Sequence, residues 1–393
     1  MTAFLPPLRL VGADLLMDGR IERAAIGLAE GQLRDDRLPE VDLTGYLVLP
    51  GIIDLHGDGF ERQVFPRPTA PFPMAAALQA TDREAAAHGV TTAWLAQSWS
   101  WEGGHRGPDQ AEALMAAVLD HRETGLTDLR VQIRAETHLV EETARLIAAV
   151  ERFRVGYVVF NDHLGEGLAM QRHQPARFAQ WAAKAALDPA ALAHRMETAR
   201  ARAREVPRAL CQMAEAFDRL GVVYGSHDDP DAETREFYSM IGARVSEFPT
   251  RRRAAQAARA AGDPVVMGAP DVVQGGSQAG NIAAEELIRE GLCDALVSDY
   301  HIPALAMAAW ALADRGHLTF ARAWGLISSG PARILRLADR GRIAPGLRAD
   351  LVVICRETRR IEATIAGGRL SYLSGRLAGR FLSPPPALRL AAE

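Results

Sequence analysis

Six side chains that can bind metal ions recur along this chain of 393 residues. Three are histidines and three are carboxylates, namely His56, Asp58, Glu136, His163, His227 and Asp299. Each one ends or closely follows a short apolar, β-branched run, which is typical of a buried strand. Imidazole nitrogens and carboxylate oxygens together suit zinc, manganese or iron, and a carboxylate such as Glu136 could bridge two ions. The residue types therefore predict a centre with one or two divalent ions, with zinc preferred.

A single histidine at a strand end is more often a hydrogen-bonded core residue than a ligand. The prediction therefore depends on several strand ends meeting at one place, and the elements between them decide whether they do. Short apolar runs alternate with alanine-rich helical segments through the middle of the chain, which favours a parallel sheet with helical crossovers. The candidate strands cover residues 52–56, 90–96, 129–136, 155–161, 222–226, 244–248, 264–268 and 295–299.

This strand count favours an α/β fold, a closed (β/α)8 TIM barrel, in which the C-terminal strand ends meet at one mouth. An open doubly wound sheet is the alternative. It is disfavoured because residues 57–59 lead into charged residues and prolines, where such a sheet has a glycine-rich loop and a helix. We expect the barrel to span residues 51–337.

Both ends of the chain have a different pattern. Short apolar runs separated by turn residues predict strands within residues 8–48 and 341–381. We expect them to pair in a small β-sandwich module of residues 1–50 and 338–393. Residues 164–220 are longer than one crossover requires, and they predict two or more helices that form either a lid over the mouth or a subunit contact. Whether the chain forms a homo-oligomer is therefore left open by the sequence.

Composition limits the class of partner. The formal net charge is −4, with 48% hydrophobic and 24% charged residues, as in an ordinary soluble globular protein without a basic nucleic-acid footprint. No apolar stretch approaches the roughly 18–20 residues of a membrane helix, and the first residues lack a secretory pattern. The three cysteines form no CxxC pair. We expect a cytoplasmic protein that acts on a small molecule and binds neither nucleic acid nor membrane.

Two segments carry a family resemblance. Residues 49–56 (LPGIIDLH) resemble the first-strand signature of the amidohydrolase superfamily, and residues 346–352 (GLRADLV) resemble its return to the β-module. A more specific set of motifs resembles, in the same order, the PhnM-type diphosphatases of the carbon-phosphorus lyase pathway. These motifs are residues 56–58, 66–68, 226–229, 247–250, 267–270 and 298–300. The resemblance covers nearly the whole chain.

The resemblance implies a metal-dependent hydrolase that cleaves the phosphoanhydride of ribose 1-methylphosphonate 5-triphosphate, or a related phosphorylated compound, and releases diphosphate. It implies that the six residues named above are the metal ligands, and that Asp299 also takes a proton from the attacking water. Besides metal ligands, a site for an anionic substrate requires cationic and polar side chains that contact the substrate. Our candidates for substrate contacts are Arg62, Arg67, Arg134, Asp228 and Gln274.

The motif at residues 56–58 departs from the usual His-x-His pair of the superfamily. Asp58 makes the first metal position richer in oxygen, which suits manganese as well as zinc. Family members commonly have Asn, Arg and His where this chain has Asp271, Gln274 and Gln278. These differences keep an alternative open, an amidohydrolase that acts on the C–N bond of an amide, cyclic amide or amidine. A non-catalytic metal-binding barrel is the second alternative.

The superfamily usually takes its bridging ligand from the fourth strand and its later histidines from the fifth and sixth. Our count places Glu136, His163 and His227 one strand earlier. We therefore expect one further strand before Leu129, in which case one of the candidate strands 244–248 and 264–268 is surplus.

Overall fold

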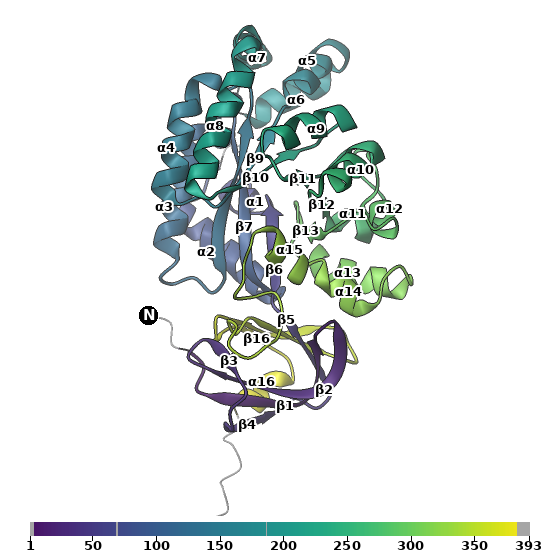
Figure 1. Cartoon of the computed structure of the whole chain (residues 1–393). Coiled ribbons are helices and arrows are strands. Elements are labelled where there is room, and N and C mark those ends of the chain that lie inside the picture. The colour runs from purple at the N-terminus through teal and green to yellow at the C-terminus, as the bar shows by residue number, and fades with distance from the viewer. Residues whose placement is uncertain (1–3, 68–69, 186, 383–393) are drawn as a thin grey trace, which may run out of the picture.

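The structure of the chain is a computed structural model that describes residues 4–67, 70–185 and 187–382. It contains two sheets, a parallel one in the middle of the chain and a second one built from both chain ends (Figure 1). Residues 1–3 and 383–393 of the expected β-module, and Pro68 of the motif at residues 66–68, lie outside the described residues.

Eight parallel strands follow one another in chain order around the barrel. They are β6 (Ile52–Gly57), β7 (Val90–Trp99), β8 (Asp128–Glu136), β9 (Tyr157–Asn161), β10 (Val223–His227), β11 (Val245–Glu247), β12 (Val265–Gly268) and β13 (Ala295–Val297). The first and last strands meet through a parallel bridge between Gly57 and Asp299. Every candidate strand is present, and the predicted barrel is confirmed.

The expectation of a further strand before Leu129 is wrong. β7 pairs directly with β8 from Thr92 to Trp99, and both β11 and β12 are strands of the barrel. Glu136 therefore ends the third barrel strand, His163 follows the fourth and His227 ends the fifth. The eight apolar runs of the sequence had been counted correctly. The expectation failed because it adjusted that count to match the usual order of ligands in the superfamily.

Helices cover the outside of the barrel. The longer ones are α2 (Met74–Ala87), α3 (Pro108–His121), α4 (Thr143–Phe153), α8 (Val206–Leu220), α9 (Ala232–Met240), α10 (Arg252–Ala261) and α13 (Ala304–Asp314). The short ones are α1 (Glu61–Val64), α11 (Ala269–Gln274), α12 (Ala284–Arg289), α14 (Phe320–Gly325) and α15 (Ser329–Ile334), with 3-10 turns η1 (Gly104–Arg106), η2 (Val140–Glu142) and η3 (Ala203–Glu205). No described helix combines the length and the apolar character that crossing a bilayer requires.

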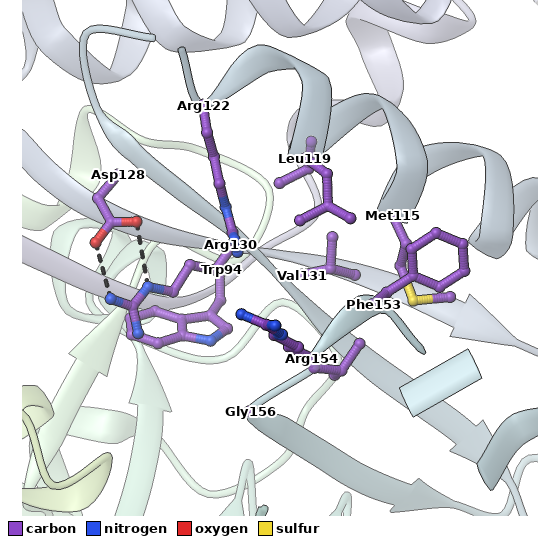
Figure 2. A pocket seen from close by; sticks show the side chains of 12 residues that line it. Trp94, Met115, Leu119, Arg122, Asp128, Arg130, Val131, Phe153, Arg154 and Gly156 are labelled. Atoms are coloured by element: carbon purple, nitrogen blue, oxygen red, sulfur yellow. Dashed lines mark hydrogen bonds and ion pairs between the residues drawn. The ribbon is translucent and has the colours of Figure 1, made fainter. Parts of the chain in front are cut away.

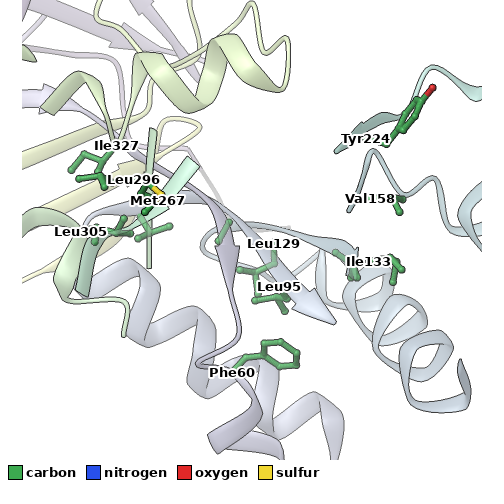
Figure 3. Packing of buried hydrophobic residues seen from close by; sticks show 14 of the residues in the cluster. Phe60, Leu95, Leu129, Ile133, Val158, Tyr224, Met267, Leu296, Leu305 and Ile327 are labelled. Atoms are coloured by element: carbon green, nitrogen blue, oxygen red, sulfur yellow. The ribbon is translucent and has the colours of Figure 1, made fainter. Parts of the chain in front are cut away.

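The period of each element decides which side chains it buries. Leu210, Met213 and Phe217 recur at spacings of three and four on α8, so they share one helix face and all are buried against the barrel. Figure 3 shows part of this layer between helices and strands. Inside the barrel the period is two, and Ile53 and Leu55 of β6 pack there with inward residues of the other strands.

The second sheet joins strands from the two chain ends and confirms the terminal β-module. Its strands are β1 (Leu8–Met17), β2 (Arg20–Ala29), β3 (Gln32–Arg34), β4 (Glu40–Asp42), β5 (Tyr46–Pro50), β14 (Leu351–Cys355), β15 (Ile361–Ala366) and β16 (Arg369–Leu373). β14 pairs with β5 over its whole length and brings residue 351 next to residue 50. A separate apolar core lies beneath this sheet, and the helix α16 (Leu377–Leu382) adds Leu377 to it.

The long segment after β9 is helical, as predicted. It forms α5 (Leu164–His173), α6 (Pro175–Lys184) and α7 (Pro189–Ala201), at the end of the barrel that lies away from the terminal β-module (Figure 1). These helices share a small apolar core with Trp101, which follows β7. Trp181 of α6 also donates its ring N–H to the buried carboxylate of Glu102 at 2.5 Å. The helices are therefore anchored to a barrel loop beside the mouth.

A buried carboxylate strengthens the seam at which the barrel closes. Asp54 of β6 accepts a hydrogen bond from the Ser298 backbone N–H at 2.9 Å and one from the Ser298 hydroxyl at 2.5 Å. We expect Asp54→Ala to lower the free energy of unfolding of the metal-free protein by about 2–3 kcal/mol, because two buried donors lose their acceptor. Urea unfolding followed by tryptophan fluorescence measures this loss. Ser298→Ala, which removes one bond, should have about half the effect; an unchanged Asp54→Ala protein would contradict the role of this contact.

Candidate active site

Four of the six predicted metal-binding side chains meet at the C-terminal mouth of the barrel. His56 and Asp58 come from the end of β6, His227 ends β10, and Asp299 follows β13. All four line a cavity of about 250 Å³. Arg134, Asp228, Phe248 and Asp271 also line it. Strand ends that are far apart in the sequence therefore converge as the barrel predicts.

The backbone turns sharply where these side chains are placed. Asp228, Phe248 and Asp299 each follow a strand and have φ values of 60°, 52° and 53°. Non-glycine residues rarely adopt this left-handed conformation, and its strain of order 1 kcal/mol each is typical of functional sites. The pairing of β6 with β7 also shifts register between Asp54 and Gly57, just where His56 lies. These irregularities turn strand-end side chains toward the cavity.

A fully buried carboxylate, Glu247, lies beneath the two histidines at the end of β11. Its Oε2 is 2.9 Å from His56 Nδ1 and 2.7 Å from His227 Nδ1. Its Oε1 accepts hydrogen bonds from the Gln132 amide at 2.9 Å and the Tyr157 hydroxyl at 3.0 Å. Glu247 belongs to the motif at residues 247–250 but was not among the predicted site residues, although its carboxylate at the end of a candidate strand was the available signal.

Glu247 fixes the orientation of both imidazole rings. Burial opposes its ionisation, but the adjacent histidines outweigh that effect and lower the pKa of Glu247 below its ordinary value. An ionised carboxylate only accepts hydrogen bonds, so Nδ1 of each histidine carries the proton that it donates to Glu247, and Nε2 is the nitrogen left for another partner. The rings stack with centroids 5.2 Å apart, and Phe248 packs edge-on against both. Both histidines are therefore held in one tautomer and one rotamer.

Two carboxylates, Asp58 and Asp299, face each other beside His56. Burial, followed by the negative charge of Asp58, raises the pKa of Asp299 to about 6. One ligand atom each from His56, Asp58 and Asp299 lies within 4.8 Å of the others. Two like charges at this separation repel each other unless a cation lies between them.

The donor set at the mouth fits a divalent metal ion. Carboxylate oxygens from Asp58 and Asp299 and a nitrogen from His56 come together in one close group. His56, His227 and Glu247 form a second close group, in which Glu247 is hydrogen-bonded to Nδ1 of both histidines. The Arg134 guanidinium lies 3.2 Å from His227 Nε2. Because a guanidinium only donates, this contact shows that Nε2 is unprotonated, as a metal ligand requires. Histidines held through Nδ1 by a carboxylate are also the usual arrangement around protein metal sites.

The other two predicted ligands, Glu136 and His163, form a separate pair. His163 Nδ1 lies 2.5 Å from Glu136 Oε1, and Trp101 donates its ring N–H to Glu136 Oε2 at 3.3 Å. Neither residue belongs to a close group of potential metal ligands among the described residues. As placed here, Glu136 is directed at His163, and its bridging of two ions stays a prediction.

Asp228 connects this pair with the four converging side chains. Its Oδ2 lies 3.7 Å from His163 Nε2 and 3.4 Å from His227 Nε2. Burial opposes its ionisation, yet the neighbouring His227 and the contact with His163 lower the pKa of Asp228 to about 2. It is therefore a carboxylate at neutral pH and completes a polar rim around the mouth. This placement keeps it a candidate for contacting substrate.

The predicted substrate contacts do not all reach the cavity. Arg134 and Asp228 line it, whereas Arg62 on α1 donates to the Gly59 carbonyl at 3.3 Å. Arg67 is exposed in the loop after α1 and is not among the cavity-lining residues. Gln274 on α11 donates to the Tyr300 hydroxyl at 2.8 Å. The structure thus places Arg134 nearer to the metal-competent side chains than either of the other two arginines.

Comparisons with known proteins find one sequence relative and several structures of similar fold. No protein-family model matches the chain. The chain is 31% identical over 368 residues to alpha-D-ribose 1-methylphosphonate 5-triphosphate diphosphatase of Escherichia coli K12, which covers 88% of this chain and 95% of that protein.

Solved structures share the fold at low sequence identity. The β-aspartyl dipeptidase of Fervidobacterium islandicum AW-1 superposes with a TM-score of 0.65 at 14% identity, covering 95% of this chain and 98% of that one. The N-acyl-D-glutamate deacylase of Bordetella bronchiseptica, solved with zinc and a phosphonate inhibitor, gives a TM-score of 0.58 at 14% identity, with 97% of both chains covered. These likenesses establish the fold and leave the substrate open.

Proposed function

Because this chain belongs to the family of the alpha-D-ribose 1-methylphosphonate 5-triphosphate diphosphatases within the amidohydrolase superfamily, we propose that it hydrolyses a phosphoanhydride. The substrate we propose is ribose 1-methylphosphonate 5-triphosphate or a related phosphorylated compound, with diphosphate as the leaving product. The chain is a hydrolase, so a non-catalytic barrel is no longer a competing explanation. The observation that carries the proposal is the pair of carboxylates, Asp58 and Asp299, beside the Arg134 guanidinium at the cavity wall.

The superfamily uses divalent metal ions, and we propose zinc here, with manganese or iron as alternatives. Such an ion supplies Lewis-acid chemistry, since it makes water more acidic and polarises a phosphoryl oxygen. His56, Asp58, His227 and Asp299 are the residues that we expect to hold it. The pair Glu136 and His163 would hold a second ion only if its side chains turn away from each other.

Asp299 is the residue we propose as general base. Its carboxylate lines the cavity, and the backbone bridge to Gly57 fixes its position at the barrel seam. A carboxylate there can accept the proton of a water that attacks phosphorus, and the Asp58 carboxylate beside it makes that acceptance more favourable. Accepting the proton keeps charge from building up at the mouth as the bond to the leaving oxygen breaks.

Arg134 is the cation we propose for the phosphate chain. It comes from β8, its NH1 lies 3.9 Å from Asp58 Oδ2, and its Nε–H is buried without a partner among the described residues. A guanidinium has five N–H donors in one plane, which suits two phosphoryl oxygens at once. Arg134 thus has donors left over for a substrate and lies against the proposed metal ligands.

One observation favours the alternative, hydrolysis of a C–N bond. Asp271 lines the same cavity, and burial raises its pKa to about 6. A carboxylate on this wall repels a polyphosphate, whereas an amide, cyclic amide or amidine can donate a hydrogen bond to it. The two functions share the same activated water and differ in the electrophile.

A panel of substrates separates the two functions. The zinc- or manganese-loaded protein is incubated with ribose 1-methylphosphonate 5-triphosphate, a nucleoside triphosphate, an N-acyl amino acid and a cyclic amide. We expect diphosphate, measured enzymatically, to be the product released with the highest kcat/KM. Chelator-treated protein is the matched control and should release none. Higher kcat/KM with a C–N substrate would overturn the proposal. Release of orthophosphate alone would mean that the enzyme cleaves the terminal phosphoanhydride bond and not the one that releases diphosphate.

A further inference from the structure

A second cavity opens at the other end of the barrel, between the strands and the helices α3 and α4. Its volume is about 310 Å³, at the lower end of the range of small-molecule sites. It lies near the beginning of β8, whereas Glu136 ends that strand. Glu136 lies six positions after Arg130, which is about 20 Å along a strand. This cavity is therefore distinct from the candidate active site.

Three arginines line this cavity together with apolar side chains. Arg122 and Arg154 reach it from the C-terminal ends of α3 and α4, and Arg130 lies on β8 (Figure 2). The opposite wall is apolar, with Met115 and Phe153 almost fully buried. Such a cavity combines one charged side with one hydrophobic side.

Arg130 is already paired and held rigid. It donates to both oxygens of Asp128, at 3.2 and 2.8 Å, and its guanidinium lies 5.0 Å above the Trp94 ring (Figure 2). Arg340 shares Asp128 at 2.8 Å and also binds both oxygens of Asp339. Arg348 also lies 4.0 Å from Asp128 and pairs with Asp350 at 2.9 Å, so three arginines meet three carboxylates and the group adds little net charge to the cavity.

Arg122 and Arg154 are not balanced in this way. Both side chains are exposed, and within the described ranges neither guanidinium has an ion pair with a carboxylate. Each follows the last residue of a helix, and a helix C-terminus carries about half a negative charge. Two arginines and two helix ends therefore leave about one positive charge beside the apolar wall. A singly charged anion fits that balance better than a dianion.

We propose that this cavity binds a small monocarboxylate with an apolar body, such as a medium-chain or aromatic acid. Its carboxylate accepts charge-assisted hydrogen bonds from Arg122 and Arg154, and its body packs against Met115 and Phe153. Guanidinium groups suit carboxylates because the two groups match in plane and spacing. The apolar wall distinguishes such a ligand from inorganic anions, which bury no hydrocarbon.

Calorimetric titration of the full-length, metal-loaded protein with sodium octanoate tests the proposal. We expect saturable binding, at least about tenfold weakened by Arg122→Met or Arg154→Met and abolished in the double variant, because each substitution removes a charge-assisted bond. Methionine keeps the apolar stem of arginine. Arg219→Met is the matched control, since Arg219 is an exposed arginine in the last turn of α8, and it should bind octanoate like the wild type.

Three results of the titration would overturn the proposal. The first is the absence of saturable binding to the wild type, and the second is equal binding by the double variant. The third is binding of neutral 1-octanol as tight as that of octanoate, which would mean that the arginines contribute nothing. Steady-state kinetics locate the ligand independently, because octanoate bound at the second cavity should not compete with substrate. Competitive inhibition that persists in the double variant would place octanoate at the barrel mouth and count against the second site.

Discussion

Asp299→Asn should lower kcat by about a thousandfold, with the fold and the bound metal nearly unchanged. Asparagine has the shape of aspartate and keeps one carbonyl oxygen as a possible ligand, but its amide cannot accept a proton from water. General base catalysis contributes about 10²- to 10⁴-fold, and the loss should fall in that range. Because the substitution leaves substrate contacts in place, KM should change much less than kcat.

Measurement of metal content separates the base role from a ligand role. Purified Asp299→Asn protein is analysed for bound zinc by mass spectrometry and then assayed at saturating metal. Asp58→Asn is the matched control, since Asp58 lies beside Asp299 and we assign it no proton transfer. We expect Asp58→Asn to bind metal about as well as Asp299→Asn does, since both variants keep one carbonyl oxygen, and to keep much of its activity at saturating metal. Wild-type activity of Asp299→Asn, or a defect that added metal repairs, would contradict the assignment of Asp299 as base.

The strands of the barrel could be predicted because each is a short apolar run that ends at a turn. Most boundaries moved by one to three residues, and one of these shifts has a clear local cause. The last strand, expected to reach Asp299, ends at Val297, and Asp299 itself has left the extended conformation with a φ of 53°. The same departure turns its carboxylate toward the mouth, so the misplaced boundary coincides with a proposed functional residue.

Which strand ends meet could be predicted only in part, because the order of strands around the barrel decides it. β6 and β13 are neighbours at the seam, so Asp58 and Asp299 face each other. β8 and β9 pair elsewhere on the barrel, and there Glu136 contacts His163. A list of strand-end residues contains both pairs without showing that they are two groups joined by Asp228.

Side chains that contact substrate or support ligands left weaker signals. Arg62 and Arg67 follow the first strand closely in sequence, yet Arg62 lies on α1 with NH2 3.9 Å from Glu84 of α2. Their closeness to the first strand in the sequence could not show in which direction these side chains point. Glu247 was overlooked for a different reason, since its partners come from four other strands and are up to 191 residues away in sequence.

Glu247→Gln should weaken metal binding about ten- to a hundredfold, the range found when a residue that supports metal ligands is altered. Glutamine has the size of glutamate, but one of its two oxygens becomes an NH2 group. The glutamate carboxylate accepts hydrogen bonds from both histidines, Gln132 and Tyr157. If the NH2 faces the histidines, their Nδ1 atoms must become acceptors, and the proton moves to Nε2, where it blocks coordination.

The opposite orientation of the glutamine amide is also unfavourable. The NH2 group would then face the amide of Gln132 and the hydroxyl of Tyr157, and the remaining carbonyl would be a neutral acceptor for two histidines. Either way the negative charge that keeps both Nδ1 atoms protonated is lost, so the two Nε2 lone pairs are no longer held in place. Zinc affinity is measured by competition with a chelator of known affinity.

Tyr157→Phe is the matched control for Glu247→Gln. It removes one donor from the same carboxylate and leaves both histidine contacts, so stability should fall by about 1 kcal/mol while zinc affinity changes little. Saturating zinc should restore most of the kcat of Glu247→Gln if Glu247 only positions the histidines. Unrestored kcat in a protein that has regained its zinc would instead mean that Glu247 itself contacts the reacting groups. Equal zinc affinity of Glu247→Gln and the wild type would exclude the positioning role, because that role requires the protons on Nδ1.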